Sequence, residues 1–327
     1  MKYRILGKTG YKVSEIGYGA WSLGADWGDV SEEQALSTLS ALPKAGINFI
    51  DTADVYGDGR SEKIISQFRQ TEKSSFTVAT KAGRRLSPHV ALGYTKKNLT
   101  SFVERSLINL KIESLDLLQL HCPPTGVYYM PEVFGALDDL VTAGKVRYYG
   151  VSVEKVEEAL KAIEFPNVST VQIIFNIFRQ RPMELFFKEA VKRNIGVIVR
   201  VPLASGLLTG KFSSNSKFAQ NDHRQYNRQG QAFDVGETFA GVDFETGLAA
   251  VEKLKSLVPE GFTLPQLALK WILAQNAVST VIAGGKNQKQ VIENSAASDL
   301  PPLDEATLRK IGEIYSSTVK PQVHFRW

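Results

Sequence analysis

The stretch LDLLQLHCPPTGVYYMPEVFGALDDLVTAGKVRYYGVS, residues 115–152, decides the fold of this chain. It contains two short apolar runs, Leu115–His121 and Val146–Ser152, separated by an amphipathic segment, Met130–Ala143. Short runs that are rich in Val, Ile, Phe or Leu are typical of fully buried parallel strands. The stretch therefore predicts a strand–helix–strand unit.

The same unit repeats along the chain. Further strands are expected at Ile16–Ala20, Asn48–Ala53, Phe76–Lys81, Thr170–Asn176, Gly196–Leu203 and Ser279–Ala283. Further helices are expected at Glu32–Lys44, Thr95–Leu110 and Glu154–Ile163, the first with Ser31 as its N-cap in a capping box with Gln34. Together they predict an α/β fold, a single (β/α)8 TIM barrel domain over residues 1–327. An open doubly wound sheet is the alternative, although no G-x-G-x-x-G follows the first strand.

Three segments do not fit this alternation of strands and helices. An N-terminal hairpin is expected, with strands at Tyr3–Leu6 and Tyr11–Ser14. Lys211–Gly241 is a long polar loop after the seventh strand, and loops of that length are usually functional lids or disordered. The tail Lys320–Trp327 ends in His-Phe-Arg-Trp, whose aromatic rings need a surface to pack against.

Composition and charge narrow the class of protein. Of 327 residues, 43% are hydrophobic and 22% are charged, as in an ordinary globular protein. The net charge of +5 comes from scattered Lys and Arg residues, which suits an anionic small molecule and does not indicate nucleic acid. The single cysteine, Cys122, excludes an intrachain disulfide. Because the sequence shows no signal peptide and no run of eighteen apolar residues, we expect a cytoplasmic protein outside the membrane. We also expect a monomer rather than an oligomer.

Four ionisable residues fall at or after the ends of successive predicted strands. Asp51 and Tyr56 belong to the second, Lys81 closes the third and His121 closes the fourth. Neighbouring parallel strands lie about 4.8 Å apart, so these side chains should converge at one rim of the barrel. A tyrosine titrates near pH ~10, and a nearby cation such as Lys81 would lower that pKa. The set is suited to acid catalysis, with Asp51 holding Lys81 and His121 donating to a substrate oxygen.

These motifs resemble those of the aldo-keto reductases, and the resemblance runs over nearly the whole chain. It rests on GYGAW (17–21), FIDTADVYG (49–57), ATK (79–81), LQLH (118–121), GKVRYYGVS (144–152), LLTGK (207–211) and IAGGKNQKQVIEN (282–294). The resemblance implies that Tyr56 is the proton donor, that Lys81 and Asp51 tune it, and that His121 orients the carbonyl. It also implies reduction of aldehydes or ketones to alcohols with NADPH.

The resemblance further assigns the cofactor site. Ser152 and Gln172 match the residues that hold the nicotinamide carboxamide, while Val153 replaces the usual Asn. Arg200 stands where a tyrosine usually covers the nicotinamide, and a planar guanidinium can also cover a ring face. The remaining positions match the pyrophosphate loop and the adenosine end: Leu203, Ser205, Gly206, Leu207, Lys211, Gly284, Lys286, Gln290, Glu293 and Asn294. Lys286 matches the partner of the adenosine 2′-phosphate, which favours NADPH over NADH.

Substrate identity is weakly encoded. Trp21, Tyr128, Tyr129 and Trp327, with Phe325, are predicted to wall an apolar pocket for a small carbonyl substrate. No metal is expected, because the four histidines are far apart and show no ligand spacing. Two other functions remain open: an NADP-binding regulatory subunit like the potassium-channel β subunits, and an NADP-dependent sugar or polyol dehydrogenase.

Overall fold

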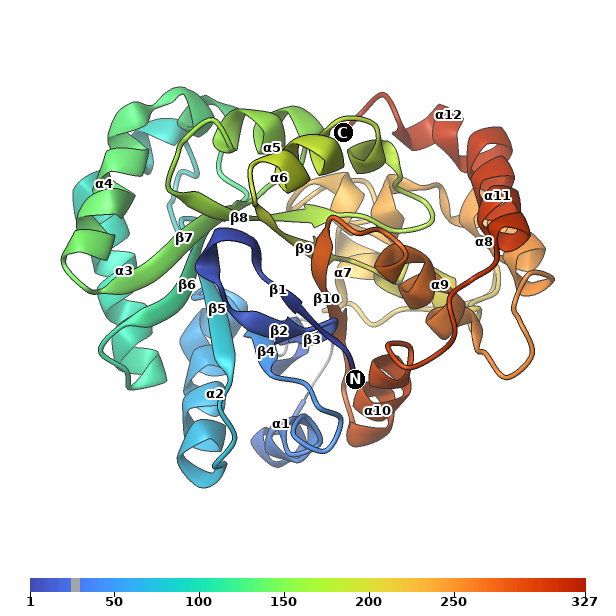
Figure 1. The fold of residues 1–327 in the computed structure, drawn as a ribbon, viewed down its shortest axis with the longest axis horizontal. Coiled ribbons are helices and arrows are strands. Elements are labelled where there is room, and N and C mark those ends of the chain that lie inside the picture. The colour runs from blue at the N-terminus through green and yellow to red at the C-terminus, as the bar shows by residue number, and fades with distance from the viewer. Residues whose placement is uncertain (25–29) are drawn as a thin grey trace.

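Eight parallel strands close into a barrel in the computed structural model, which describes residues 1–24 and 30–327. The order around the barrel is β10-β3-β4-β5-β6-β7-β8-β9 (Figure 1). The strands are β3 (Ile16–Gly19), β4 (Phe49–Asp51), β5 (Thr77–Ala82), β6 (Leu115–His121), β7 (Val146–Ser152), β8 (Val168–Ile174), β9 (Gly196–Arg200) and β10 (Val278–Gly284). The prediction of a (β/α)8 barrel is confirmed.

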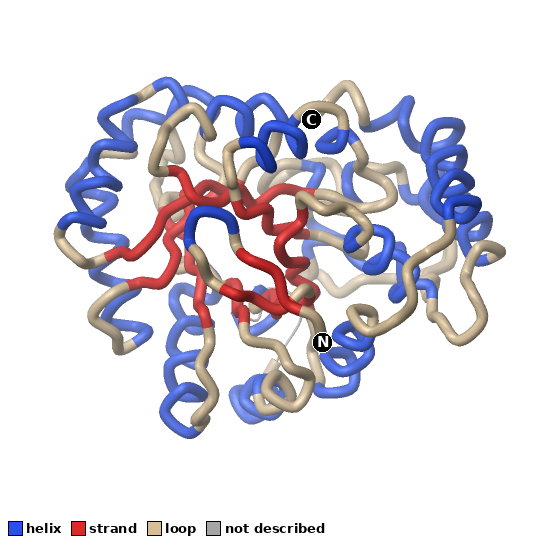
Figure 2. Tube along the Cα trace, viewed as in Figure 1, coloured by secondary structure: helices blue, strands red, loops and turns tan. Residues whose placement is uncertain are grey.

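Helices surround the barrel, with the strands gathered at the centre (Figure 2). They are α1 (Glu32–Leu39), α2 (Arg60–Thr71), α3 (Lys96–Leu110), α4 (Pro131–Thr142), α5 (Val156–Ala162), α6 (Phe186–Lys192), α7 (His223–Tyr226), α8 (Phe244–Lys255), α9 (Leu264–Leu273), α10 (Gln288–Ala296), α11 (Glu305–Ile314) and α12 (Lys320–Val323). No helix in the described ranges is both long and apolar enough to cross a membrane.

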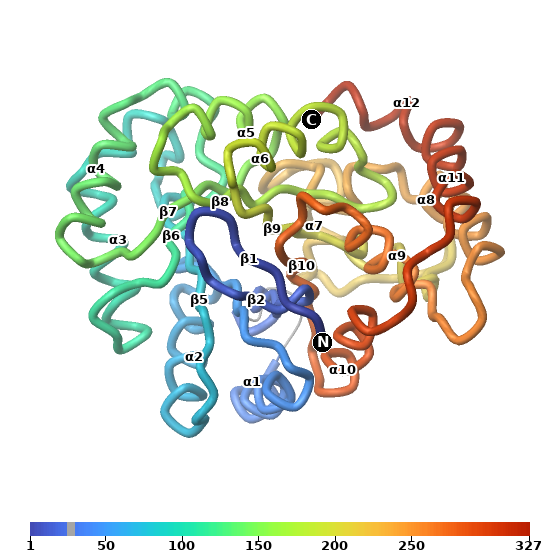
Figure 3. Tube along the Cα trace, in the orientation of Figure 1, coloured from blue at the N-terminus to red at the C-terminus, as the bar shows by residue number. Residues whose placement is uncertain are grey.

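The N-terminal hairpin, β1 (Tyr3–Ile5) and β2 (Lys12–Ser14), is antiparallel and lies in front of the strands in the view of Figure 3. Its buried residues Leu6 and Val13 pack against a layer of barrel side chains formed by Phe49, Ala79, Leu117, Ile198 and Ile282. Burying these apolar side chains stabilises the fold and closes the N-terminal end of the barrel. The carboxyl ends of the strands are therefore left to build a site.

Several boundaries differ from the sequence prediction. The strand expected to end at Leu203 ends at Arg200, because Val201 has a φ of +52°, which a strand cannot continue through. The first helix ends at Leu39 rather than Lys44, just before a turn that contains Pro43. Its capping box is half formed: Ser31 accepts from the Gln34 backbone, but the Gln34 side chain donates to the carbonyl of Lys286 instead.

Candidate active site

A cavity of about 410 Å³ opens at the carboxyl ends of the barrel strands. It begins beside Tyr56 and His121, passes the loop after β9 and ends at the start of α10. Its lining includes residues that the sequence assigned to catalysis and to the cofactor: Asp51, Tyr56, His121, Ser152, Gln172, Arg200, Leu203, Ser205, Gly206, Lys211, Gly284, Lys286, Gln290, Glu293 and Asn294. Residues from six strand ends thus meet in one elongated space.

Lys81 links the polar residues at the inner end of the cavity. Its Nζ lies 2.5 Å from Asp51 Oδ1, 2.8 Å from the carbonyl of Thr52 and 3.3 Å from the Tyr56 hydroxyl. The His121 ring lies edge-on to Tyr56, with ring centroids 5.9 Å apart. The structure therefore brings the four strand-end residues into one cluster, as the sequence predicts.

Burial sets the charge states in this cluster. It raises the pKa of Tyr56, with Lys81 opposing the shift, so the phenol is protonated at neutral pH. Burial works against the charge on Lys81, but Asp51 raises the Lys81 pKa above its ordinary value. Burial and then Arg84 hold the pKa of His121 well below 6.5, so the imidazole is neutral. A neutral phenol thus faces a lysine cation and an uncharged imidazole.

Two glutamines donate to Asp51, and the sequence predicts neither contact. Gln172 donates to Asp51 Oδ2 at 2.7 Å, and Gln119 donates to the same oxygen at 3.1 Å. The side-chain oxygen of Gln172, Oε1, accepts a hydrogen bond from Ser152 Oγ at 3.5 Å. Gln172, which the resemblance assigns to the carboxamide, therefore already orients the carboxylate behind Lys81. The sequence does not identify Gln119 as a site residue, because a single polar residue at an inward position of the strand LDLLQLH matches no motif.

Arg200 lies at the end of β9 among carboxylates that sequence reasoning missed. Its Nη2 lies 3.0 Å from Glu154 Oε2, and its Nη1 lies 3.5 Å from Glu237 Oε1. Arg84 bridges the same two carboxylates at 3.2 Å and 2.8 Å. Glu237 follows β9 by more than thirty residues in a polar loop, so no local signal connects it to this site.

The loop after β9 has an unusual backbone. Val201, Ala204 and Ser205 all have positive φ, and Gly206 follows with a φ of +97°. Such conformations cost roughly 1–3 kcal/mol each in residues other than glycine and gather at functional sites. A Cβ on Gly206 would lie 3.0 Å from the Phe212 ring, so this position needs glycine. Leu207 is buried, and the Ser205 hydroxyl donates to the carbonyl of Glu237.

The far end of the cavity lies at the N-terminus of α10. Asn287 caps the helix by accepting from Gln290 N, and the Gln290 side chain accepts from Lys286 N. Asn294 donates to the carbonyl of Gly284. Burial lowers the pKa of Lys286, and Arg224 lowers it further. Two cations and a helix N-terminus are a combination suited to a phosphate.

The predicted substrate pocket is only partly assembled. Trp21 lines the cavity and its ring stacks 6.1 Å from that of Tyr56. Tyr128, Tyr129 and Trp327 are not among the described residues that line it. Tyr128 is buried, Tyr129 is exposed, and Trp327 packs under Arg179 with a guanidinium-to-ring distance of 3.7 Å. Phe325 is exposed. Only Trp21 of this set therefore meets the polar cluster.

Part of the segment 211–241 lines the cavity. Phe212, Arg224 and Glu237 line the cavity, and His223 lies 4.9 Å from the Trp21 ring between centroids. Arg224 pairs with Asp222 and stacks 4.6 Å from the centre of the Phe218 ring. The segment is therefore packed on the rim of the barrel, and whether it moves on ligand binding stays a prediction.

Comparison with known proteins identifies the family to which this chain belongs. Residues 15–316 match the aldo/keto reductase family. The chain belongs to that family. It is 30% identical over 316 residues, 95% of each chain, to "Uncharacterized oxidoreductase YqkF" of Bacillus subtilis. It is 30% identical, over the full length of both chains, to "Probable voltage-gated potassium channel subunit beta" of Arabidopsis thaliana.

Further relatives of this aldo/keto reductase bear on cofactor and fold. An aldo-keto reductase of Schizosaccharomyces pombe, yakc, is named for NADP(+) and is 29% identical over 92% of this chain and 88% of its own. Among solved structures, the glycerol dehydrogenase AKR11B4 from Gluconobacter oxydans matches with a TM-score of 0.79 and 26% identity. That match covers 97% of this chain and 95% of the other. The chain is thus an oxidoreductase of a family whose members include NADP-dependent enzymes.

Proposed function

We propose that this aldo/keto reductase reduces a small aldehyde or ketone to an alcohol with NADPH, using Tyr56 as the proton donor. The observation that carries the proposal is the position of Lys81 between Asp51 and the Tyr56 hydroxyl, at 2.5 Å and 3.3 Å. That arrangement has one chemical advantage. Burial keeps the phenol protonated beforehand, and Lys81 places a cation beside the phenolate afterwards.

Each residue of the cluster has a distinct part in this scheme. Tyr56 gives its proton to the carbonyl oxygen and regains one from solvent or from an alcohol in the reverse direction. Lys81 stabilises the transient phenolate, and Asp51 holds Lys81 charged and in place. His121, being neutral, donates one N–H bond to the carbonyl oxygen and does not compete as an acid. Bound NADPH would supply the hydride.

The cavity residues fit NADPH. The donor set at its far end comprises Lys286, Arg224 and the N-terminus of α10, which suits the charge of a nucleotide 2′-phosphate. Gly206 lines the cavity in the loop after β9, and glycine-containing loops let a pyrophosphate approach the backbone. Lys286, Gln290 and Asn294 would hold the adenosine end, while Arg200 and Ser152 would contact the nicotinamide end.

The direct test is NADPH oxidation, followed by absorbance, against a panel of aliphatic and aromatic aldehydes, ketones and aldoses. We expect turnover with at least one member of the panel and none in Tyr56→Phe. The matched control is Tyr94→Phe, which removes a buried phenol hydroxyl outside the Lys81 cluster. Equal loss in both variants would mean that Tyr56 has no special role.

A second candidate function is an NADP-binding subunit of a channel, which the full-length match to the potassium channel β subunit supports. A third is oxidation of polyols, which the structural match to a glycerol dehydrogenase supports. NADPH binding without turnover of any carbonyl, together with a tetramer in solution, would favour the subunit. Turnover of glycerol with NADP⁺ exceeding that of every carbonyl would favour the polyol dehydrogenase.

A further inference from the structure

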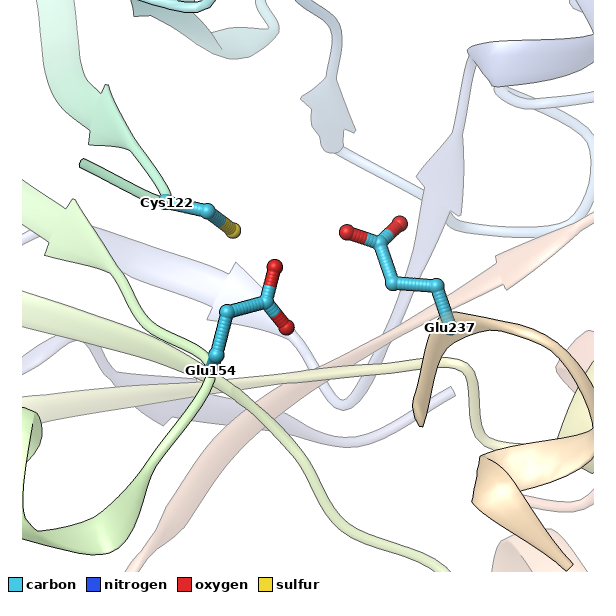
Figure 4. Close-up of side chains that lie close together, drawn as sticks. All are labelled: Cys122, Glu154 and Glu237. Atoms are coloured by element: carbon cyan, nitrogen blue, oxygen red, sulfur yellow. The ribbon is translucent and has the colours of Figure 1, made fainter. Parts of the chain in front are cut away.

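Three side chains converge on Arg200 at the inner end of the cavity. Figure 4 shows the Cys122 thiol and the carboxylates of Glu154 and Glu237 pointing toward one another. One donor atom from each lies within 4.8 Å of the others, a spacing that metal ligands can have. In this structure all three lie against the Arg200 guanidinium, at 3.5 Å, 3.0 Å and 3.5 Å respectively. The cation that they surround is therefore an arginine.

The three groups come from different parts of the chain. Cys122 follows β6 and Glu154 follows β7, so both belong to the barrel itself. Glu237 belongs to the segment 211–241, and it is the residue by which this segment reaches Arg200. Its side chain is only 6% exposed, and a carboxylate so deeply buried must be paired. Arg84, at 2.8 Å, is its second partner.

The two carboxylates differ in how firmly they are charged. Burial raises the pKa of Glu154 to about 7, with Arg200 opposing the shift. Burial would raise that of Glu237 as well, but Arg84 and then Arg200 outweigh it and hold the pKa low. Near neutral pH, Glu237 is therefore the carboxylate that stays ionised beside Arg200.

The turn that carries Glu237 does not depend on this ion pair alone. Asp234 accepts a hydrogen bond from the Trp327 indole at 2.9 Å. Ser205 donates to the Glu237 carbonyl at 2.9 Å and accepts from Phe239 N at 3.1 Å. Because these bonds hold the backbone of the turn, the charge of Glu237 is left to act on the two arginines.

We propose that Glu237 is a positioning residue through which the segment 211–241 orients the Arg200 guanidinium over the nicotinamide position. The inference rests on the proposed function, since it takes Arg200 as the residue that covers that ring. A guanidinium covers a ring only when its plane is held. Glu154 and the Val153 carbonyl hold Nη2, and Glu237 holds Nη1, so both ends of the fork are fixed. Placing the segment and ordering the nicotinamide contact then become one event.

The test compares two ligands that differ in the nicotinamide half. NADPH and adenosine 2′,5′-bisphosphate share the adenosine end, and only NADPH reaches Arg200. In Glu237→Gln, we expect the Kd for NADPH to rise about tenfold, because a charge-assisted contact is lost, and the Kd for the bisphosphate to stay within about twofold. An equal loss for both ligands would mean that Glu237 only fastens the segment, and no loss for either would overturn the proposal as well.

Two further variants separate positioning from general loosening. Asp234→Asn weakens the same turn without touching Arg200, so any effect should be equal for the two ligands. A selective loss of NADPH affinity in Asp234→Asn would overturn the proposal. In an Arg200→Ala background, Glu237→Gln should cause no further loss of NADPH affinity, and an additional tenfold loss would contradict it.

Glu237→Asp controls for a folding defect. It keeps the buried negative charge but moves the carboxylate away from Arg200 by the length of one methylene. It should show the same selective loss in milder form, and an unchanged NADPH affinity would count against the proposal. Wild-type protein that binds neither ligand would instead refute the proposed function, before any variant is measured.

Discussion

Asp54 is a buried acid next to the catalytic cluster that the proposed mechanism does not use. It follows β4, lies three residues after Asp51, and is fully buried. Neither of its carboxylate oxygens has a hydrogen-bond partner within the described part of the chain. Burial and then the neighbouring Glu62 raise its pKa from 3.8 to about 7, while Arg85 and Arg105 oppose the shift. Folding therefore favours the protonated form of this carboxyl.

The sign and size of the effect on stability follow from linkage. Between pH 3.8 and about 7 the folded state holds a proton on Asp54 that the unfolded state releases, so stability falls as pH rises through this window. A shift of about three units corresponds to ~4 kcal/mol in total, of which ~2.5 kcal/mol is lost between pH 5 and pH 8. Asp54→Asn removes the titrating group, and with it this pH dependence.

The assay is urea unfolding of wild type and Asp54→Asn at pH 5 and pH 8, with equal m-values required for comparison. We expect the variant to gain ~2.5 kcal/mol relative to wild type over that interval. The matched control is Glu113→Gln, which removes an exposed carboxylate and should show no such gain. If the difference between wild type and Asp54→Asn is the same at both pH values, the pKa of Asp54 is not raised and the reasoning fails.

Three other predictions concern the cavity. Tyr56→Phe should abolish carbonyl reduction and leave NADPH affinity nearly unchanged, and a kcat above about a tenth of wild type would show that another acid acts. Lys286→Ala should weaken NADPH binding by roughly 1.5–3 kcal/mol, or about ten- to a hundredfold, with little effect on NADH; equal wild-type affinities for the two cofactors would contradict this. Amide hydrogen exchange across residues 211–241 should slow when NADPH saturates the protein, and unchanged protection would exclude a lid.

The sequence alone was sufficient to predict features that a short run of consecutive residues defines. The apolar runs predicted all eight strands of the barrel, because a buried parallel strand must be apolar on both faces. Asp51, Lys81 and His121 could be placed together because each is the last or next-to-last residue of a strand, and the ends of parallel strands share one rim. Lys286 could be placed near a helix N-terminus for a similar reason.

Long-range packing decided the rest. The motif assigns Gln172 to the nicotinamide carboxamide, which stays a prediction, and only the fold shows that its amide also donates to Asp51, a residue 121 positions away. Their aromatic character predicts Tyr128 and Trp327 as pocket residues, yet aromatic rings pack equally well in a core, and both are buried. Glu237 shares no motif with Arg200 and Arg84, and it meets them only because the segment 211–241 folds back over the barrel. Charges separated by this much chain attract one another only after the backbone has brought them together, so their pairing is a property of the tertiary structure.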